Sequence, residues 1–248
     1  MTRPLSVVII TKNEQRNIER CLTSVKWADE VVIVDSGSTD KTVDICQKHD
    51  CRVFEIDWLG FSGTKQYAVD QATNDWILSI DADERVTANL RSEIESLLDD
   101  KPQYHGYQIP RQSTYLGQII RHSGWNRDRP LRLFNREFGA FNAKSVHEAV
   151  HVQGHVGELR SFLLHHPYPD IQTHLEKMNL YTELAAQELA AAGRRSTPLG
   201  AVVHGATKFI KMYVLQRGFL DGTAGFVLAK NSAFGVYLKY IKLWQKTR

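Results

Sequence analysis

The sequence lacks a long apolar run and holds few cysteines among its 248 residues. No run approaches the roughly 18–20 apolar residues of a membrane-spanning helix, so none is expected. The three cysteines, Cys21, Cys46 and Cys51, show no C-x-x-C spacing. This excludes a disulfide framework and a zinc site, and it predicts buried thiols in a reducing compartment. No signal-peptide pattern precedes the first apolar stretch, which favours a cytoplasmic location.

Glycine-rich phosphate-binding motifs are also missing from the sequence. There is no G-x-x-x-x-G-K-[ST], and no G-x-G-x-x-G follows the first apolar stretch. A P-loop is therefore excluded, and a dinucleotide-binding Rossmann site is not indicated. The 31 basic and 28 acidic residues give a net charge of +3, which is too small to indicate a nucleic-acid partner.

Short apolar runs alternate with helical patterns over the first hundred residues. β-strands are predicted at 5–10, 30–35, 51–57 and 75–81, and helices at 13–27, 38–50 and 62–73. Ser38 or Thr39 offers an N-cap for the second helix. Continuous apolar strands that alternate with helices predict an α/β fold with a parallel sheet covered on both faces.

The pattern changes after residue 100. Antiparallel strands with turns between them are predicted at 104–117 and 129–141, and helices at 172–192 and about 201–246. The chain is therefore divided into an α/β half (1–100), a mixed β half (101–170) and a helical region (171–248).

Polar residues follow three of the predicted strands. Residues 11–14 read TKNE, residues 35–40 read DSGSTD, and the fourth strand ends in Asp81, Asp83 and Glu84. Ligands of open parallel sheets bind beyond the carboxyl ends of the strands. Carboxylates without a nearby thiolate or imidazole suit Mg²⁺ or Mn²⁺, which commonly bridges a protein to a diphosphate. The alternative is a solvated strand end with ordinary turns and helix caps.

Three blocks resemble the inverting family 2 glycosyltransferases of the GT-A fold in their order and spacing. They are LSVVIITKNEQRNIERCLTSV (5–25), EVVIVDSGSTDKTVDIC (30–46) and DWILSIDADERV (75–86). The similarity continues through RLFNRE, SVHEAV, LLHHPYPD and RGFLDGTAGFVLA, and it indicates the lipopolysaccharide inner-core β-glucosyltransferase branch. Enzymes of that branch pass glucose from UDP-glucose to a heptose.

The resemblance implies a metal-dependent UDP-sugar transferase with a Rossmann-like, mostly parallel sheet, a mixed β acceptor region and a C-terminal helical extension. Thr11 and Glu14 would then border the uracil and the ribose, and Asp35 would accept a hydrogen bond from the base. Asp81 would lie by the ribose and the metal, and Asp83 would ligate Mg²⁺ or Mn²⁺ at the diphosphate. Residues 1–100 would bind the nucleotide sugar, and residues 101–170 would bind the acceptor and hold the catalytic base.

Inverting transfer needs a base for the acceptor hydroxyl and positive charge for the departing UDP. By the same resemblance Glu148 is the expected base and His147 contacts substrate, with a surface glutamate as the alternative. Lys65 stands where relatives often carry an Arg-Asn pair, and it would neutralise phosphate as a point charge. His166 is the expected second metal ligand, although a structural histidine is the alternative and His165 could face the site instead.

The stretch SGWNRDRPLRLFNR (123–136) suits acceptor binding. The face of Trp125 is a natural platform for a sugar ring, and Arg127 and Arg132 suit phosphates of the diphosphate or of a phosphorylated glycolipid core. The alternative is core packing for the tryptophan and solvation for the arginines.

The C-terminal residues form a basic amphipathic pattern. Ala233, Tyr237, Tyr240, Ile241 and Trp244 share one helical face, and Lys239, Lys242 and Lys246 lie opposite. Such a helix suits an anionic membrane surface, and the alternative is a helix packed on the domain with a solvated basic side. A lipid-linked acceptor favours a peripheral location on the inner face of the inner membrane.

Three other functions remain open at this point. A polyprenyl-phosphate glycosyltransferase would share the donor site. A sugar nucleotidyltransferase would share the α/β architecture. It usually carries a glycine-rich N-terminal loop, whereas the corresponding stretch TKNEQRN (11–17) contains no glycine. A catalytically inactive sugar-nucleotide-binding module is the third.

Overall fold

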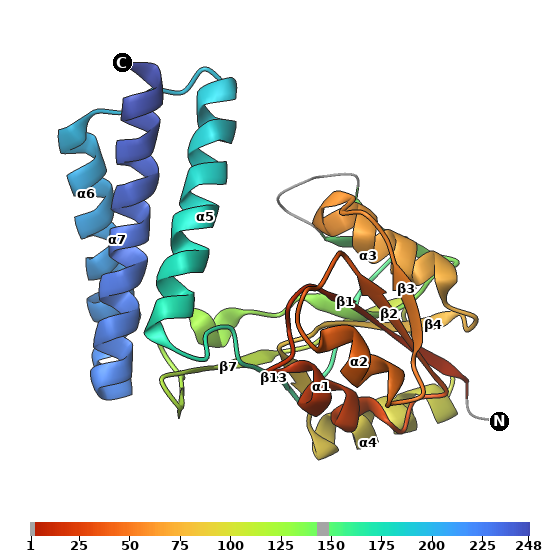
Figure 1. The fold of residues 1–248 in the computed structure, drawn as a ribbon. Coiled ribbons are helices and arrows are strands. Elements are labelled where there is room, and N and C mark those ends of the chain that lie inside the picture. Colours follow the sequence, from red (N-terminus) through yellow and green to blue (C-terminus); the bar gives the residue numbers. More distant parts are fainter. Residues whose placement is uncertain (1–2, 143–148) are drawn as a thin grey trace. The chain divides into compact units, whose positions relative to one another are not determined.

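The computed structural model describes residues 3–142 and 149–248 of the chain. They form two compact units (Figure 1). The first unit comprises residues 1–111 and 129–165, and the second comprises residues 112–128 and 166–248. The first is an α/β unit and the second is mainly helical.

A seven-stranded sheet forms the centre of the first unit, in the order β12-β6-β9-β4-β1-β2-β3. The strands β3, β2, β1 and β4 are mutually parallel, as predicted, whereas β9 runs antiparallel to β4 and β6. The bounds are β1 (Leu5–Thr11), β2 (Glu30–Asp35), β3 (Arg52–Glu55), β4 (Trp76–Asp81), β6 (Gly106–Gln108), β9 (Leu131–Asn135) and β12 (Gly157–Glu158).

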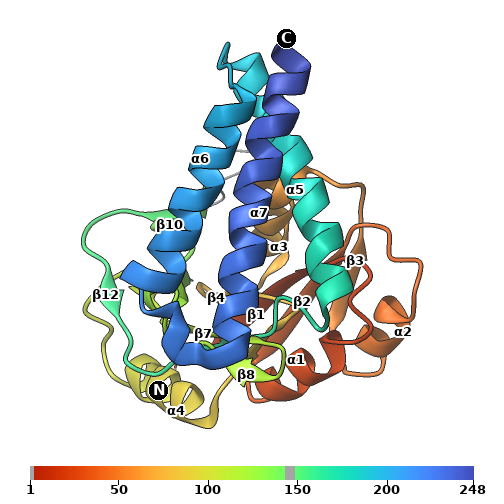
Figure 2. The same cartoon turned by 90° about the vertical axis from the view of Figure 1, so that its left-hand side faces the viewer.

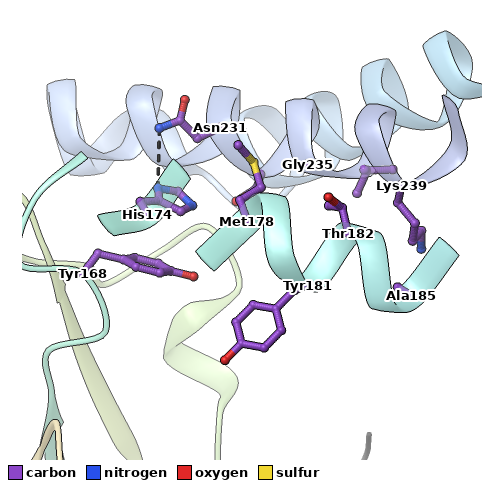
Figure 3. A pocket seen from close by; sticks show the side chains of 11 residues that line it. Tyr168, His174, Met178, Tyr181, Thr182, Ala185, Asn231, Gly235 and Lys239 are labelled. Carbon is purple, nitrogen blue, oxygen red and sulfur yellow. Dashed lines mark hydrogen bonds between the residues drawn. The ribbon is translucent and has the colours of Figure 1, made fainter. Parts of the chain in front are cut away.

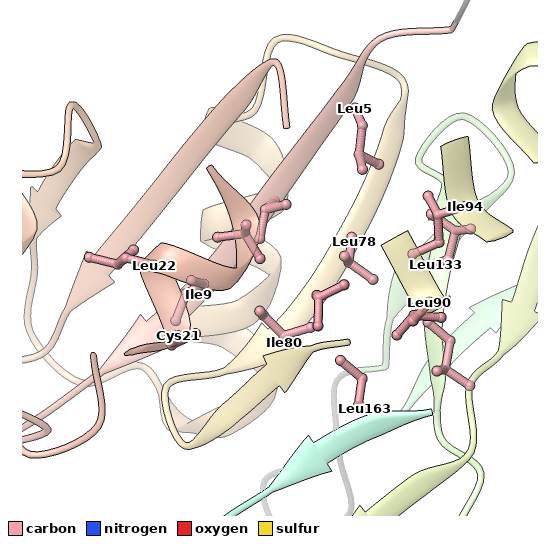
Figure 4. Packing of buried hydrophobic residues seen from close by; sticks show 14 of the residues in the cluster. Leu5, Ile9, Cys21, Leu22, Leu78, Ile80, Leu90, Ile94, Leu133 and Leu163 are labelled. Carbon is pink, nitrogen blue, oxygen red and sulfur yellow. The ribbon is translucent and has the colours of Figure 1, made fainter. Parts of the chain in front are cut away.

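Helices cover both faces of this sheet, which confirms the predicted fold class (Figure 1). On one face α1 (Ile18–Val25), α2 (Thr42–Gln47) and α4 (Ala88–Asp99) pack against alternate strand residues such as Ile9 and Ile80 (Figure 4). On the other face α3 (Gly60–Gln71) packs against Val8, Val34 and Ile77. The cysteines are free thiols, and Cys21 and Cys46 are buried in the core between the sheet and α1, α2 and α4.

The first two helices are shorter than predicted. Asn13 has a left-handed backbone with φ 56°, so α1 begins only at Ile18. The prediction that Ser38 or Thr39 caps α2 is wrong, because the helix begins at Thr42. Asp40 Oδ1 instead accepts a hydrogen bond of 2.9 Å from the Thr42 N–H, while the Ser38 hydroxyl is bound to Asp35.

Three short antiparallel pairs complete the β structure. In the first unit β5 (Glu84–Val86) pairs with β13 (Leu163–His165), and β10 (Gly139–Phe141) pairs with β11 (Val150–Val152). The hairpin of β7 (Arg111–Tyr115) and β8 (Gln118–Ile119) leads from the first unit into the second. These pairs confirm antiparallel structure in the predicted regions.

Three long helices form most of the second unit (Figure 2). They are α5 (Ile171–Ala191), α6 (Pro198–Phe209) and α7 (Gly222–Thr247), and α7 contacts both of the others. A π-helical turn, η2 (Ile210–Leu215), extends α6, and short 3-10 helices lie at Trp125–Arg127 (η1) and Gly218–Asp221 (η3). The predicted helical stretch 201–246 is thus interrupted, because Arg217 and Gly222 have φ of 56° and 59°.

Candidate functional site

The sheet register places three of the predicted polar residues at one edge. Thr11 at the end of β1 pairs with Asp35 at the end of β2, and Ile10 pairs with Asp81 at the end of β4. The carboxyl ends of these parallel strands therefore meet, as the sequence predicted.

Two cations hold the carboxylate of Asp81. Lys65 Nζ, from α3, lies 2.8 Å from Oδ1, and Arg132 Nη2, from β9, lies 2.5 Å from Oδ2. Burial alone would raise the pKa of Asp81, but the charges and hydrogen bonds of Arg132 and Lys65 hold that pKa well below its ordinary value. Asp81 is therefore an anion with both oxygens engaged by the protein.

Glu84 is fully buried and completes this network. Its Oε1 lies 2.8 Å from Arg132 Nη2 and 3.0 Å from Arg111 Nη1, and its Oε2 accepts a 2.9 Å hydrogen bond from the Asp81 N–H. Burial alone would lower the pKa of Arg132, but the charges of Asp81 and Glu84 raise it. Two carboxylates following a buried strand are thus stabilised by three cations from distant elements.

The carboxylate of Asp83 lies beside the imidazole of a histidine. Its Oδ1 lies 3.6 Å from Nε2 of His165, and both side chains are mostly buried. Among the residues that the structure describes, no three His, Cys, Asp or Glu side chains are arranged to hold a metal. Mg²⁺ is commonly bound by one or two protein ligands, with phosphates and water filling the remaining positions. The carboxylate of Asp83 is a ligand of this kind, and the imidazole of His165 lies beside it.

The three residues predicted to bind the nucleoside differ in their surroundings. Thr11 Oγ1 is buried and has no hydrogen-bond partner within residues 3–142 and 149–248. Asp35 is fully buried and accepts hydrogen bonds from the N–H groups of Gly37 (3.0 Å) and Ser38 (2.7 Å). Glu14 Oε2 accepts a hydrogen bond of 2.8 Å from Asn17. Their nucleotide-binding roles stay predictions.

The remaining predicted residues belong to the second unit or lie outside the described residues. Trp125, Arg127 and His166 belong to the second unit, where His166 Nδ1 lies 2.7 Å from the Thr114 hydroxyl. Their acceptor and metal roles stay predictions, as does the substrate role of Arg132. The base Glu148 and its neighbour His147 lie outside the described residues.

The sequence did not identify Arg111 and Glu84 as part of the site. Glu84 was visible as one of three clustered carboxylates, but nothing local indicated which of them would be buried. Arg111 lies in β7, and the sequence signals it only by its position after the apolar residues Ile109 and Pro110. His165 occupies the last position of β13, where its imidazole lies beside Asp83.

The predicted membrane-facing side of α7 makes contacts within the second unit. The Tyr240 ring stacks on His204 of α6, with 4.0 Å between the ring centroids, and Lys246 pairs with Glu183 of α5 at 2.6 Å. A membrane role of this face stays a prediction. In the parts of the chain described, no helix has both the length and the apolar character needed to span a bilayer.

A cavity of about 280 Å³ lies between α5 and α7 (Figure 3). His174 lies at one end, where Nδ1 is 2.8 Å from the Tyr115 hydroxyl and the ring stacks on Tyr168. Asn231 and Lys239 also line the cavity. These contacts satisfy the buried imidazole within the second unit.

Comparison with known proteins identifies relatives over the full chain. The model of glycosyl transferase family 2 matches residues 6–154. An uncharacterized glycosyltransferase of Rickettsia bellii is 33% identical over 263 residues, covering 98% of this chain and 87% of that protein. The lipopolysaccharide core biosynthesis glycosyltransferase LpsC of Rhizobium meliloti is 30% identical over 250 residues, covering 98% and 93%.

Among solved structures, residues 1–349 of S. aureus TarS in complex with UDP-GlcNAc are similar in fold. The TM-score is 0.52 at 15% identity, and the match covers 94% of this chain and 81% of that chain. This similarity confirms the predicted GT-A architecture of a mostly parallel sheet with helices on both faces.

Proposed function

Because the chain belongs to glycosyl transferase family 2, we propose that it moves a sugar from a nucleotide donor to an acceptor with inversion. The donor is UDP-glucose and the acceptor is a heptose of the lipopolysaccharide inner core. The relative named as a lipopolysaccharide core biosynthesis glycosyltransferase supports the acceptor class. The observation that carries the proposal is the strand-end site, where ion pairs fix Asp81 and Glu84 and Asp83 faces His165.

The donor nucleotide binds at the carboxyl edge of β1, β2 and β4. The buried Thr11 hydroxyl and the carboxylates of Glu14 and Asp35 contact the uridine. With Asp83, the site holds three carboxylates and the three cations Lys65, Arg111 and Arg132, and these cations suit the phosphates of a diphosphate. Asp81 is already ionised and oriented, so it accepts ribose hydroxyl hydrogen bonds without reorganisation.

Asp83 and His165 would hold a divalent cation, Mg²⁺ or Mn²⁺. Such an ion neutralises the negative charge that develops on the leaving diphosphate. His166, the ligand predicted from the sequence, remains an alternative to His165. A manganese titration of the His165→Ala and His166→Ala variants distinguishes them, since only the variant that lacks a ligand loses manganese affinity.

The transfer is a single displacement at the anomeric carbon. The acceptor oxygen forms a bond to that carbon, the bond from the carbon to the UDP oxygen breaks, and its electron pair leaves with UDP. The hydroxyl proton passes to the carboxylate of Glu148. Trp125, Arg127 and His147 position the acceptor. In this proposal residues 1–100 bind the donor and residues 101–170 supply the acceptor site.

A mass-spectrometric transfer assay tests the proposal. The purified protein is mixed with UDP-glucose and Mg²⁺ or Mn²⁺, and truncated lipopolysaccharide is supplied as acceptor. Other UDP- and GDP-sugars and a polyprenyl phosphate are tested in parallel. We expect one hexose to be added to the lipopolysaccharide, with loss of transfer in Asp83→Ala and loss of turnover but retained UDP binding in Glu148→Gln.

Two outcomes would contradict the proposal. Transfer only to polyprenyl phosphate would show that the lipopolysaccharide heptose is not the acceptor. Release of pyrophosphate from a sugar phosphate and UTP would indicate a nucleotidyltransferase. The exposed Asp99, at the end of α4, provides a matched control, since Asp99→Ala removes a carboxylate outside the site and should leave transfer unchanged.

A further inference from the structure

We propose that one exposed apolar face of the second unit rests on an anionic lipid surface. This surface, the α6 face, runs along α6 and η2 and around the turn that follows. It consists of Leu199, Val202, Val203, Ile210, Val214, Leu215, Phe219 and Leu220. The inference rests on the proposed function in one respect, namely that the acceptor is lipid-linked.

The apolar residues of the α6 face have the spacing of an amphipathic helix. Leu199, Val203, Ala206, Ile210 and Val214 follow one another at spacings of three or four residues, and Val202 lies next to Val203, so they form one stripe along the helix. All eight side chains are 48–74% exposed, and Leu199 and Leu215 are the most exposed. A contiguous row of large apolar side chains in water is unusual for a monomer and indicates a surface that another phase or molecule covers.

The positive charge of this region indicates what covers the α6 face. Residues 194–248 contain ten Lys and Arg residues and a single acid, Asp221. That acid is engaged within the unit, with Oδ1 lying 2.9 Å from His122 Nδ1. Lys211, Arg217 and Lys230 are exposed. A second copy of the chain would bring like charges together, whereas phosphate headgroups complement them.

The turn in the α6 face is fixed to the predicted acceptor segment. Asp221 accepts hydrogen bonds from the N–H groups of Arg121 (3.1 Å) and His122 (3.0 Å), and the Ser123 N–H donates to the Gln216 carbonyl (3.0 Å). Trp125 and Arg127 follow directly in η1. Contact of the turn with lipid would therefore hold the acceptor residues near the headgroups, where a glycolipid presents its core sugars.

Vesicle co-sedimentation tests the surface. The full-length protein is mixed with vesicles of phosphatidylcholine alone or with added phosphatidylglycerol. We expect binding to the anionic vesicles only, and a loss of about tenfold or more in the Leu215→Asp/Leu220→Asp variant. The matched control, Leu180→Asp/Leu184→Asp, places the same charges on exposed positions of α5 and should bind like the unmodified protein. Equal binding of both variants would overturn the inference.

A fluorescent label tests insertion without changing charge. Leu215→Cys and Leu180→Cys are labelled with an environment-sensitive fluorophore. Cys21 is buried, and burial raises the pKa of Cys46 to about 12 and that of Cys51 to about 11, so the introduced thiol reacts first. We expect a blue shift with anionic vesicles at Leu215 only. If the label at position 215 shows the same blue shift without vesicles, and light scattering shows a dimer, the inference is overturned. The α6 face would then bind a second copy of the chain.

The two proposals fail separately. Neither vesicle experiment involves sugar transfer, so vesicle binding without transfer would contradict the proposed function alone. Transfer by a protein that does not bind anionic vesicles would contradict the α6 face alone.

Discussion

Arg132 Nη2 lies 2.5 Å from Oδ2 of Asp81, which joins β9 to the end of β4 at the centre of the candidate site. The same nitrogen lies 2.8 Å from Glu84 Oε1. One guanidinium from the antiparallel part of the sheet therefore pairs with two carboxylates at the end of a parallel strand. It fixes the positions of Asp81 and Glu84 on either side of Asp83.

Replacing Arg132 by Met is expected to destabilise the first unit strongly. Removing one partner of a buried ion pair typically costs about 3–5 kcal/mol, because the other charge stays buried without compensation. Arg129 supplies the matched control. It is 45% exposed and lies 3.5 Å from Glu158, so Arg129→Met should cost less than about 1 kcal/mol. Urea unfolding of both variants measures the difference, and equal losses would show that the network adds little to stability.

Gly225→Ala should destabilise the helical unit, although alanine is the better helix former. A Cβ at Gly225 would clash with the Gly218 carbonyl oxygen, and this backbone atom cannot move aside easily. Overpacking costs of about 1–3 kcal/mol or more exceed the roughly 1 kcal/mol of helix propensity gained. The exposed neighbour Thr223 is the control, and Thr223→Ala should change stability by less than about 0.5 kcal/mol. A thermal melt in which Gly225→Ala is the more stable protein would refute this packing.

The helical unit should lose stability as the pH falls. Burial lowers the pKa of His174 below its ordinary value of 6.5, so the unfolded chain binds a proton that the folded chain does not. The neutral His174 contributes fully to the free energy of unfolding when the pH is above its pKa in the unfolded chain. This contribution is lost as the pH falls toward the pKa of His174 in the folded chain. The loss is at most about 1.4 kcal/mol per pH unit. His174→Gln should flatten the dependence between about pH 7 and pH 5, whereas His155→Gln, at an exposed position, should not. Parallel urea-unfolding curves for the unmodified protein and His174→Gln at both pH values would contradict this.

The sheet and its covering helices could be predicted because their signals are local. Strand β1 contains four consecutive apolar residues (7–10), and α1 buries Ile18, Cys21, Leu22 and Val25 at helical spacing. A ligand edge could also be predicted, since polar residues follow parallel strands whose ends must meet. These inferences need no contact between distant parts of the chain.

The partners within the site could not be predicted, because they depend on such contacts. Glu84 meets Arg111 and Arg132, which lie 27 and 48 positions further along the chain. The contact of His165 with Asp83 depends on how β13 and β5 pair. The break between η2 and α7 was missed although Gly218 and the Asp221-Gly222 dipeptide are turn signals, whereas the left-handed Arg217 carries no such signal.

The central claim is that the carboxylate of Asp83 couples a divalent cation to UDP. Calorimetric titration of UDP into the protein, with Mn²⁺ or with chelator, tests it most directly in the unmodified chain, Asp83→Ala and the Asp99→Ala control. The account predicts that Mn²⁺ strengthens UDP binding at least about tenfold in the unmodified chain and the control, and that this gain disappears in Asp83→Ala. UDP affinity that is the same with chelator as with Mn²⁺, and unchanged by Asp83→Ala, would contradict it.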